Sequence, residues 1–358
     1  MKCLVCGKNE ANQTGAHIFP AWIIASAFDI NSRTRDHEIV YALQPFDSKL
    51  PYFGNSVQTD KIIDQIGRDL TDDEIVNQQN YLTVDNLWCR TCERKFSIVE
   101  EYFLENVDRQ VTDFTNCNNT SIYKLSTANN FIIRLFFYSL LLRAHLSSFM
   151  GFKLNLRAFR KLKYFVNHYI QDNLLNTKNF IDSSYRKDQL LKYPIRCLKT
   201  EQENATEGWV YVHEKHDRPY CFIINKYFIQ FYGKGDQTNF KPADFFSVSS
   251  IITEMEDIKN YKEDVFKIGL INYELYTIVK KHYINYVTDI RMNNYILMFR
   301  LLFKSKFKRS PTREMTSIFL KELLENDLPL GIKYTREMIV AALNRSLIKI
   351  NELSMAES

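Results

Sequence analysis

Two short cysteine motifs that lie far apart in the sequence constrain this chain more than any other feature. Cys3 and Cys6 form one Cys-x-x-Cys pair close to the N-terminus, and Cys89 and Cys92 form another. Each pair presents two sulfur atoms to one metal ion from a tight turn, and two pairs supply the complete tetrahedral shell of a structural zinc site. We therefore predict that these four cysteines bind a single Zn²⁺.

Two other interpretations of the cysteine pairs are open. A redox-active dithiol of the thioredoxin type needs a strand before the motif, and Cys3 stands too close to the N-terminus for one. Alternatively, the cysteines are unrelated buried thiols, which is our interpretation of Cys117, Cys197 and Cys221. Two such pairs are not expected by chance, and this favours the zinc site.

Residues beside the cysteine pairs carry a resemblance to a known family. His17 stands in a His-Ile-Phe-Pro segment after the first pair, Asn86 shortly before the second pair, and Glu93 directly after it. The pattern resembles the HNH endonucleases in their four-cysteine zinc form, of the ββα-metal or treble-clef type. The resemblance implies a zinc-bound β-hairpin and helix, with His17 as general base on water. It also implies that Asn86 and Glu93 orient the reacting groups or bind a catalytic Mg²⁺ or Mn²⁺.

The residue before the histidine departs from the family pattern, which usually has Asp, Glu or His there as a metal ligand, whereas this chain has Ala16. A narrower group of HNH-like bacterial proteins, some associated with defence against phage, commonly has a small residue at that place. The motif from Cys89 to Glu100 and the later Leu142-Arg143-Ala144 are similar to that group, so the resemblance covers residues 1 to 150. His37, in an Asp-His pair, is an alternative general base.

Composition limits the class of protein. The 358 residues suffice for two or three domains, and the scarcity of Gly (10) and Pro (8) favours long regular elements. The net charge of +5 permits binding to a polyanion without requiring it. Seven cysteines suit a reducing compartment, the chain enters its first motif without a signal segment, and the apolar run 135–142 is too short to cross a bilayer. We therefore expect a cytoplasmic protein with no membrane partner.

The periodicity of apolar residues predicts an α+β fold that is predominantly α-helical. We expect an HNH-like zinc module over residues 1–110, interrupted by a polar insert at 31–80, and then a helical bundle domain over 111–205. Aromatic and β-branched runs predict a small antiparallel β-sheet at 206–250. A helical C-terminal region, 251–358, contains a basic stretch at 300–313.

Two groups of basic residues are candidate contacts for nucleic acid, because lysine and arginine release condensed counterions when they neutralise phosphates. They are Arg157, Arg160 and Lys161 in the first group, and Arg300, Lys304, Lys306, Lys308 and Arg309 in the second. A solvated helix face explains the first group as well, and satisfaction of a helix dipole explains part of the second. The final helical hairpin is a candidate contact for DNA, for a second copy of the chain or for a partner protein.

These observations lead to one expected function and two alternatives. We expect an HNH-like, metal-dependent endonuclease that hydrolyses phosphodiester bonds in nucleic acid, with DNA as the expected substrate. The first alternative is a catalytically inactive zinc module that binds nucleic acid or protein, with Ala16 recording the loss of the metal site. The second is a structural subunit of a larger complex, without a salt-dependent affinity for DNA.

Overall fold

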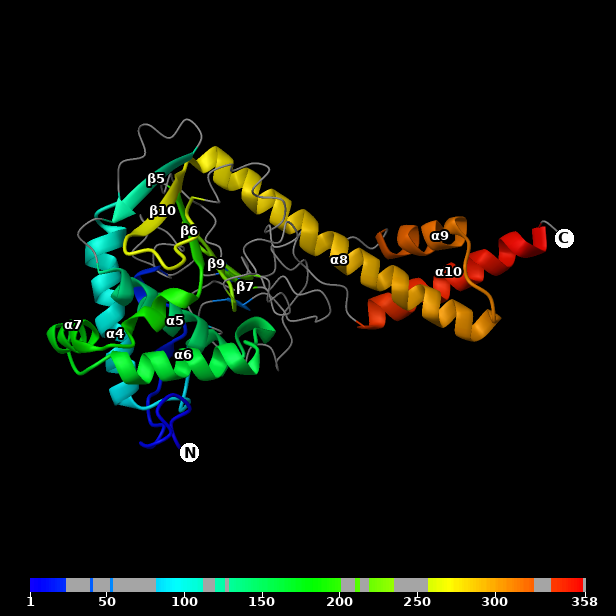
Figure 1. Cartoon of the computed structure of the whole chain (residues 1–358). Coiled ribbons are helices and arrows are strands. Elements are labelled where there is room, and N and C mark those ends of the chain that lie inside the picture. Colours follow the sequence, from blue (N-terminus) through cyan, green and yellow to red (C-terminus); the bar gives the residue numbers. More distant parts are fainter. Residues whose placement is uncertain are drawn as a thin grey trace. The chain divides into compact units, whose positions relative to one another are not determined.

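The fold is described here from a computed structural model (Figure 1). The residues that the structure describes are 1–23, 39–40, 52–53, 82–111, 120–125, 129–200, 210–212, 219–234, 257–324 and 336–356. The chain divides into two compact units. One comprises Met1–His37 with Gln79–His282, and the other comprises Glu38–Gln78 with Tyr283–Ser358. Most of the insert expected at 31–80, including His37, lies outside the described residues.

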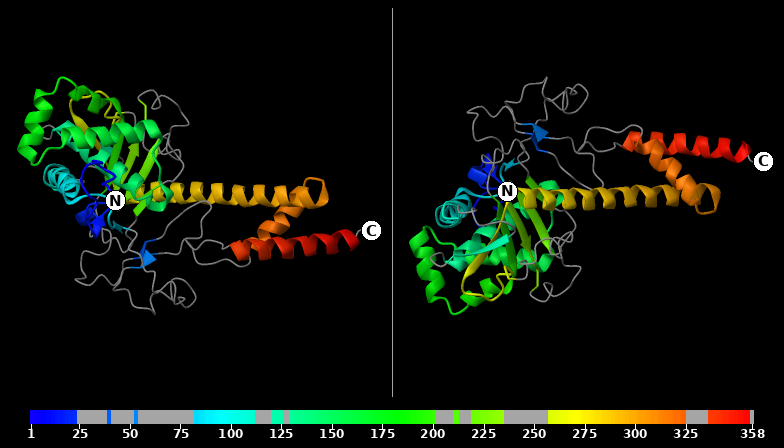
Figure 2. Two further views of the ribbon diagram at one scale, coloured as in Figure 1. Left: turned by 90° about the horizontal axis from the view of Figure 1, so that it is seen from below. Right: turned by 90° about the horizontal axis from the view of Figure 1, so that it is seen from above.

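The first unit begins with a short hairpin followed by a helix. Strand β1 (Ala16–His17) pairs antiparallel with β4 (Thr83–Val84), and α4 (Arg90–Phe103) follows directly. In both views of Figure 2 the N-terminal segment, in blue, lies beside α4, in cyan. A π-helical turn, η1 (Leu104–Asp108), extends α4. The first unit therefore contains a short antiparallel strand pair and a helix that follows its second strand. The other unit contains a separate pair, β2 (Ile39–Val40) with β3 (Tyr52–Phe53).

Three further helices of the first unit each begin at an asparagine. They are α5 (Asn130–Leu146), α6 (Leu156–Tyr169) and α7 (Leu174–Ser183). The side chains of Asn129, Asn155 and Asn173 accept hydrogen bonds from backbone N–H groups of the first turns, as N-cap residues do. Short 3₁₀ turns, η2 (Phe149–Gly151) and η3 (Lys187–Lys192), lie between and after them. Nearly all of α5 is buried.

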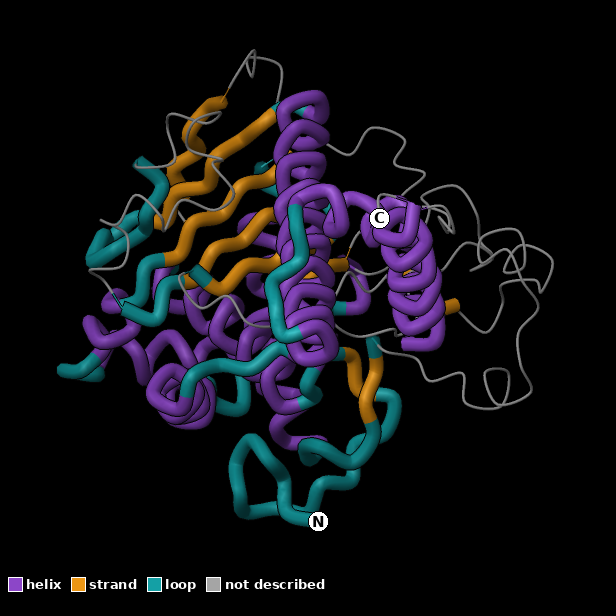
Figure 3. The backbone as a smooth tube through the Cα atoms, turned by 90° about the vertical axis from the view of Figure 1, so that its right-hand side faces the viewer, coloured by secondary structure: helices purple, strands orange, loops and turns teal. Residues whose placement is uncertain are grey.

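The sheet of the first unit is mixed and larger than predicted. Its strands, in spatial order, are β5 (Thr120–Leu125), β10 (Phe266–Ile271), β6 (Ile195–Thr200), β9 (Tyr227–Phe231), β8 (Tyr220–Ile224) and β7 (Val210–Val212). Only the pairing of β10 with β6 is parallel. Figure 3 shows these strands, in orange, side by side.

Strands β7, β8 and β9 lie within 206–250 and pair antiparallel as predicted, but they are part of a larger sheet, so the predicted extent was wrong. Strands β5 and β6 fall within 111–205, which was predicted to be helical, and β10 falls within 251–358. Two of these strands carry no clear alternation, because β6 buries Arg196 and Lys199 and β5 is a polar edge strand. Their assignment depends on pairing with distant segments, which periodicity does not report.

The core of the first unit lies between helix α5 and the sheet. The Phe103 ring stacks on Phe136 at 4.0 Å, and Phe137 stacks on Phe266 of β10 at 5.6 Å. Arg134 is fully buried in α5 and donates to the carbonyls of Tyr193 and Asn260. Buried charge of this kind requires hydrogen-bond partners, and Arg134 finds them in carbonyl oxygens, without a carboxylate. The helix is thus fixed in rotation against the sheet.

The second unit contains helical segments with their own apolar core. Helix α8 (Tyr273–Phe307) enters it from the first unit, and α9 (Arg313–Leu324) and α10 (Arg336–Ala356) follow. Phe299 of α8 and Phe319 of α9 stack at 4.7 Å, and the core extends to α10. Thr312 caps α9, since its hydroxyl accepts a hydrogen bond from the backbone N–H of Met315. Among the described residues, no helix is both long and apolar enough to cross a membrane.

Candidate metal centre

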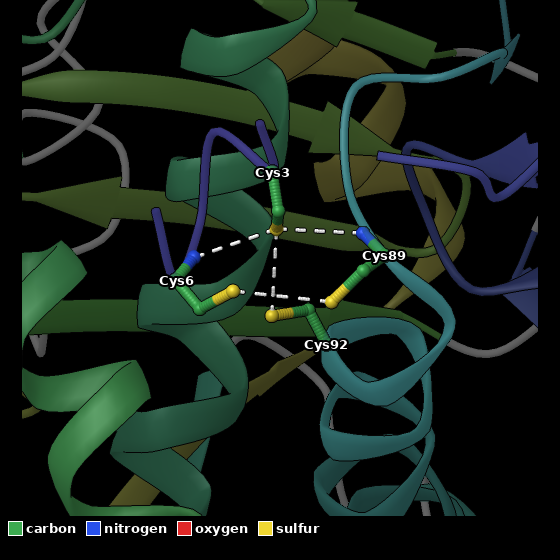
Figure 4. Close-up of side chains that lie close together, drawn as sticks. All are labelled: Cys3, Cys6, Cys89 and Cys92. Carbon is green, nitrogen blue, oxygen red and sulfur yellow. Dashed lines mark hydrogen bonds between the residues drawn. The ribbon is translucent and has the colours of Figure 1, made fainter. Parts of the chain in front are cut away.

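The first cysteine pair lies on a tight turn at the N-terminus. The backbone N–H of Cys3 donates to the carbonyl of Asn9 at 2.8 Å, and that of Gly7 donates to the carbonyl of Cys3 at 2.8 Å. Gly7 has a φ of +70°, a conformation that glycine adopts without strain. The turn brings Cys3 and Cys6 to one side, so that both sulfurs face the second pair (Figure 4).

The second cysteine pair belongs to the start of helix α4. Cys89 is the N-cap residue, and Cys92 lies in the first turn. The spacing of three residues places both side chains on one side of the helix, because residues i and i+3 are neighbours on a helical surface. The helix N-terminus also carries partial positive charge, which stabilises thiolates. The sequence thus folds locally so that both pairs converge.

The four sulfur atoms have the spacing of a tetrahedral zinc site. The Sγ atoms of Cys3 and Cys92 are 3.7 Å apart, those of Cys6 and Cys89 are 3.9 Å apart, and all four lie within 4.8 Å of one another. A tetrahedral ion with Zn–S bonds of 2.3 Å requires sulfurs about 3.8 Å apart. No disulfide forms between them. The cluster that the two Cys-x-x-Cys motifs predict is confirmed, and it fits a structural metal such as Zn²⁺.

Backbone N–H groups surround the cluster and stabilise negative charge on its sulfurs. The N–H groups of Cys6 and Cys89 donate to the Cys3 sulfur at 3.4 Å each, and the side-chain amide of Asn9 donates to the Cys89 sulfur at 3.5 Å. Bonds of this kind fix the thiolates of a metal site in orientation. The ligand set therefore has its outer partners in place within the chain itself.

The pKa values of the thiols indicate why the cluster needs a cation. Burial raises the pKa of Cys3, and burial together with the neighbouring sulfurs raises that of Cys92. Burial also acts to raise the pKa of Cys6, yet the backbone N–H groups of Asn9 and Lys8 bring it to about 6. Four thiolates cannot share this small space unless a positive ion compensates their charge.

The three residues expected to take part in catalysis surround the same hairpin and helix. His17 is half-buried in β1, where it lies opposite Thr83. Asn86 is exposed in the turn after β4 with a φ of +56°, and its side chain makes no hydrogen bond with the described residues. Its backbone N–H donates to the carbonyl of Gln13 at 2.7 Å. Asn86 thus supplies a turn conformation that asparagine tolerates well.

Glu93 is half-buried in the first turn of α4 and is already engaged. Its carboxylate accepts a hydrogen bond of 2.5 Å from the indole N–H of Trp88. Burial raises the pKa of Glu93, whereas the nearby Arg143 and the Trp88 bond act to lower it. The carboxylate also lies on the lining of a cavity of about 570 Å³ along α4. Glu93 therefore has a structural partner in Trp88 and also lines a cavity that is open to solvent.

Two side chains contact the backbone of the segment that carries His17. Asp85 accepts a hydrogen bond of 2.6 Å on Oδ1 from the backbone N–H of Gly15. Arg143, from the buried helix α5, donates to the backbone carbonyl of His17 at 3.0 Å. Arg143 also forms an ion pair with Glu100 of α4. The local signal for Asp85 was its place beside Asn86.

The predicted basic contacts lie on the surface of both units. Arg157, Arg160 and Lys161 are exposed on α6 of the first unit. The other five are exposed on α8 and directly after it in the second unit: Arg300, Lys304, Lys306, Lys308 and Arg309. None of these eight side chains forms an ion pair with a described residue. Their charge is therefore available to a polyanion.

Comparison of the chain with protein-family models, with curated proteins and with solved structures finds no match. The arrangement of the residues themselves must therefore support any functional assignment.

Proposed function

We propose that this protein is an HNH-like, metal-dependent endonuclease that cleaves phosphodiester bonds in nucleic acid, with DNA as the first substrate to test. The observation that carries the proposal is the arrangement around the four cysteines. The turn bearing Cys3 and Cys6 and the start of helix α4 bring the four cysteines together, and His17 lies on β1, which pairs with β4 shortly before that helix. A role in defence against phage follows only from the narrower family resemblance.

In this proposal the cysteine-bound Zn²⁺ is structural, since all four of its ligand positions are protein thiolates and no open position remains for water. His17 takes the proton of the attacking water as general base. A bound Mg²⁺ or Mn²⁺ supplies positive charge that stabilises the developing charge on the phosphate. Glu93 is the described carboxylate of the module closest in sequence to the cysteine ligands, and it either holds that ion or orients its surroundings.

Nucleic acid binding is assigned to the exposed basic residues. Arg157, Arg160 and Lys161 present three positive charges on one helix, and five more are clustered at the end of α8. Contacts of this kind to phosphates give an affinity that falls steeply with salt concentration. Replacing Lys304 and Lys308 together by Gln should therefore weaken DNA binding and reduce the salt dependence by about two phosphate contacts.

The proposal is tested by incubating purified protein with supercoiled DNA and Mn²⁺ or Mg²⁺. We expect nicking by the unaltered chain and its loss in His17→Ala, with zinc content near one ion per chain in both. His282→Ala, at an exposed position of α8, is the matched control and should nick normally. Nicking by His17→Ala at the rate of the unaltered chain would remove the catalytic assignment.

A second function, that of a zinc-stabilised module that binds nucleic acid or protein without cleaving it, is favoured by two observations. Ala16 is 2% exposed and offers no ligand where the family usually has one. In addition, the four cysteines form the only group of three or more potential metal ligands among the described residues. This function predicts DNA binding without nicking, and no Mn²⁺ beside His17 in crystals soaked with that ion.

A further inference from the structure

The segment Gly15–His17 carries the proposed general base and is held by two side chains in addition to its backbone pairing. Strand β1 is two residues long and pairs with β4 through Ala16 opposite Val84 and His17 opposite Thr83. Gly15, just before it, has a φ of +59°, the left-handed conformation, and an added Cβ there would meet open space. Backbone bonds continue the pairing on both sides, because the N–H of Ile18 donates to the carbonyl of Leu82 at 2.8 Å and the N–H of Asn86 donates to the carbonyl of Gln13 at 2.7 Å.

Asp85 holds the beginning of this segment. In the register of the hairpin, the position after Val84 lies across from the position before Ala16, so Asp85 faces Gly15. Its Oδ1 accepts the Gly15 backbone N–H at 2.6 Å. A bond from a neutral N–H to a charged carboxylate is among the stronger hydrogen bonds of proteins. Asp85 thus continues the hairpin by one further cross-strand contact, made by a side chain.

Arg143, on helix α5, holds the other end of the segment. It is 1% exposed, and its Nη1 donates to the backbone carbonyl of His17 at 3.0 Å. Two contacts fix the guanidinium itself: an ion pair with Glu100 of α4, and the face of the Phe96 ring 4.9 Å away. These two contacts restrict the guanidinium, so it cannot easily move with the His17 carbonyl if that carbonyl is displaced. Helix α5 therefore sets the position of His17 through one side chain.

We propose that Asp85 and Arg143 are positioning residues that fix the Gly15–His17 segment at both ends and so orient the imidazole of His17. The importance of this imidazole orientation for catalysis rests on the proposed nuclease function, whereas the fixing of the segment does not. Neither residue contacts a substrate in this assignment. The two act through the backbone on either side of Ala16, one on the N–H of Gly15 and one on the carbonyl of His17.

Asp85 is tested with a pair of variants, because it is exposed and its replacement leaves the core intact. Asp85→Asn keeps an acceptor oxygen, whereas Asp85→Ala removes it. We expect Asp85→Ala to lower kcat for nicking by about tenfold or more with KM little changed, since small misplacements of reacting groups have effects of this size. Asp85→Asn should restore most of the rate. Equal rates for the unaltered chain and Asp85→Ala would overturn the assignment.

Arg143 is tested against a second buried arginine of the same helix. Arg143→Met should lower kcat, and the double variant Arg143→Met with Glu100→Gln removes the carboxylate that the first change leaves unpaired. Arg134→Met is the matched control, since Arg134 is equally buried in α5 but contacts Tyr193 and Asn260 instead of the hairpin. An equal loss of kcat in the Arg134 and Arg143 variants would show that Arg143 acts only through packing of the core, which would overturn its assignment as a positioning residue.

A spectroscopic measurement separates failure of this inference from failure of the nuclease proposal. The chain has seven histidines, and the imidazole NMR signals of His17 are assigned by their loss in His17→Gln. We expect Asp85→Ala and Arg143→Met to shift the His17 signals while zinc content stays near one per chain, and Arg134→Met to leave them in place. This holds whether or not the protein nicks DNA. Unshifted His17 signals in both Asp85→Ala and Arg143→Met would overturn the inference.

Discussion

Removal of the metal from the four-cysteine centre should strongly destabilise the first unit. A metal ion bound by the four cysteines would join the N-terminal turn to helix α4, and Cys6 and Cys89 are 83 positions apart in the sequence. Without the metal, this long segment is closed only by the hairpin and by packing. Removal of the metal therefore gives the unfolded chain more conformational freedom, and this lowers the free energy of unfolding.

The size of this effect follows from the length of the closed segment. For a loop of 83 residues, cross-linking lowers the entropy of the unfolded chain by the equivalent of about 4.5 kcal/mol at 25 °C. Repulsion among the buried sulfurs of the metal-free cluster adds to this. Against a typical domain stability of roughly 5–15 kcal/mol the loss is large. For a unit of this length it corresponds to a fall in melting temperature of roughly 10–20 °C.

The assay is thermal unfolding followed by calorimetry, with and without a zinc chelator, alongside a measurement of zinc content. Cys89→Ser should have a low melting temperature that the chelator does not lower further. Cys197→Ala is the matched control, because Cys197 is a buried thiol of strand β6 outside the cluster. That variant should keep its zinc and its response to the chelator. If the unaltered chain melted at the same temperature in both conditions, the cross-link argument would be refuted.

Three further predictions concern the fold. Asp108→Asn should cost about 3 kcal/mol in urea unfolding, because it leaves Lys199 buried without its carboxylate. Burial would raise the pKa of Asp108, but Lys199 and Lys226 hold it below 3.8, so its contribution is present above about pH 4 and is lost as pH falls through the folded-state pKa. Phe299→Ala should cost about 3–5 kcal/mol and speed hydrogen exchange in α8, α9 and α10, with exchange in the first unit unchanged. Gly269→Ala places a Cβ 2.6 Å from a leucine of β6 and should cost about 1–3 kcal/mol by thermal unfolding.

The candidate site shows how far local sequence signals reach. The Cys-x-x-Cys spacing is itself a geometric statement, because a tight turn or a helix start brings both sulfurs to one side. Cys3, Cys6, Cys89 and Cys92 could therefore be assigned to one cluster from the sequence. The contacts of Asp85 and Arg143 could not, because nothing in the neighbourhood of either residue indicates that it meets the backbone of the strand that carries His17.

The helices were determined largely by the sequence, and the sheet was decided by tertiary structure. Asparagine caps and a continuous apolar segment defined α5 because every backbone bond of a helix joins residues close in sequence. Strand β10, in contrast, pairs with β5 through Phe266 opposite Leu125 and with β6 through Gly269 opposite Leu198. A short apolar run becomes a strand only when such distant partners supply its hydrogen bonds. The folded chain therefore decided where the sheet extends and which side chains contact the backbone at Gly15 and His17.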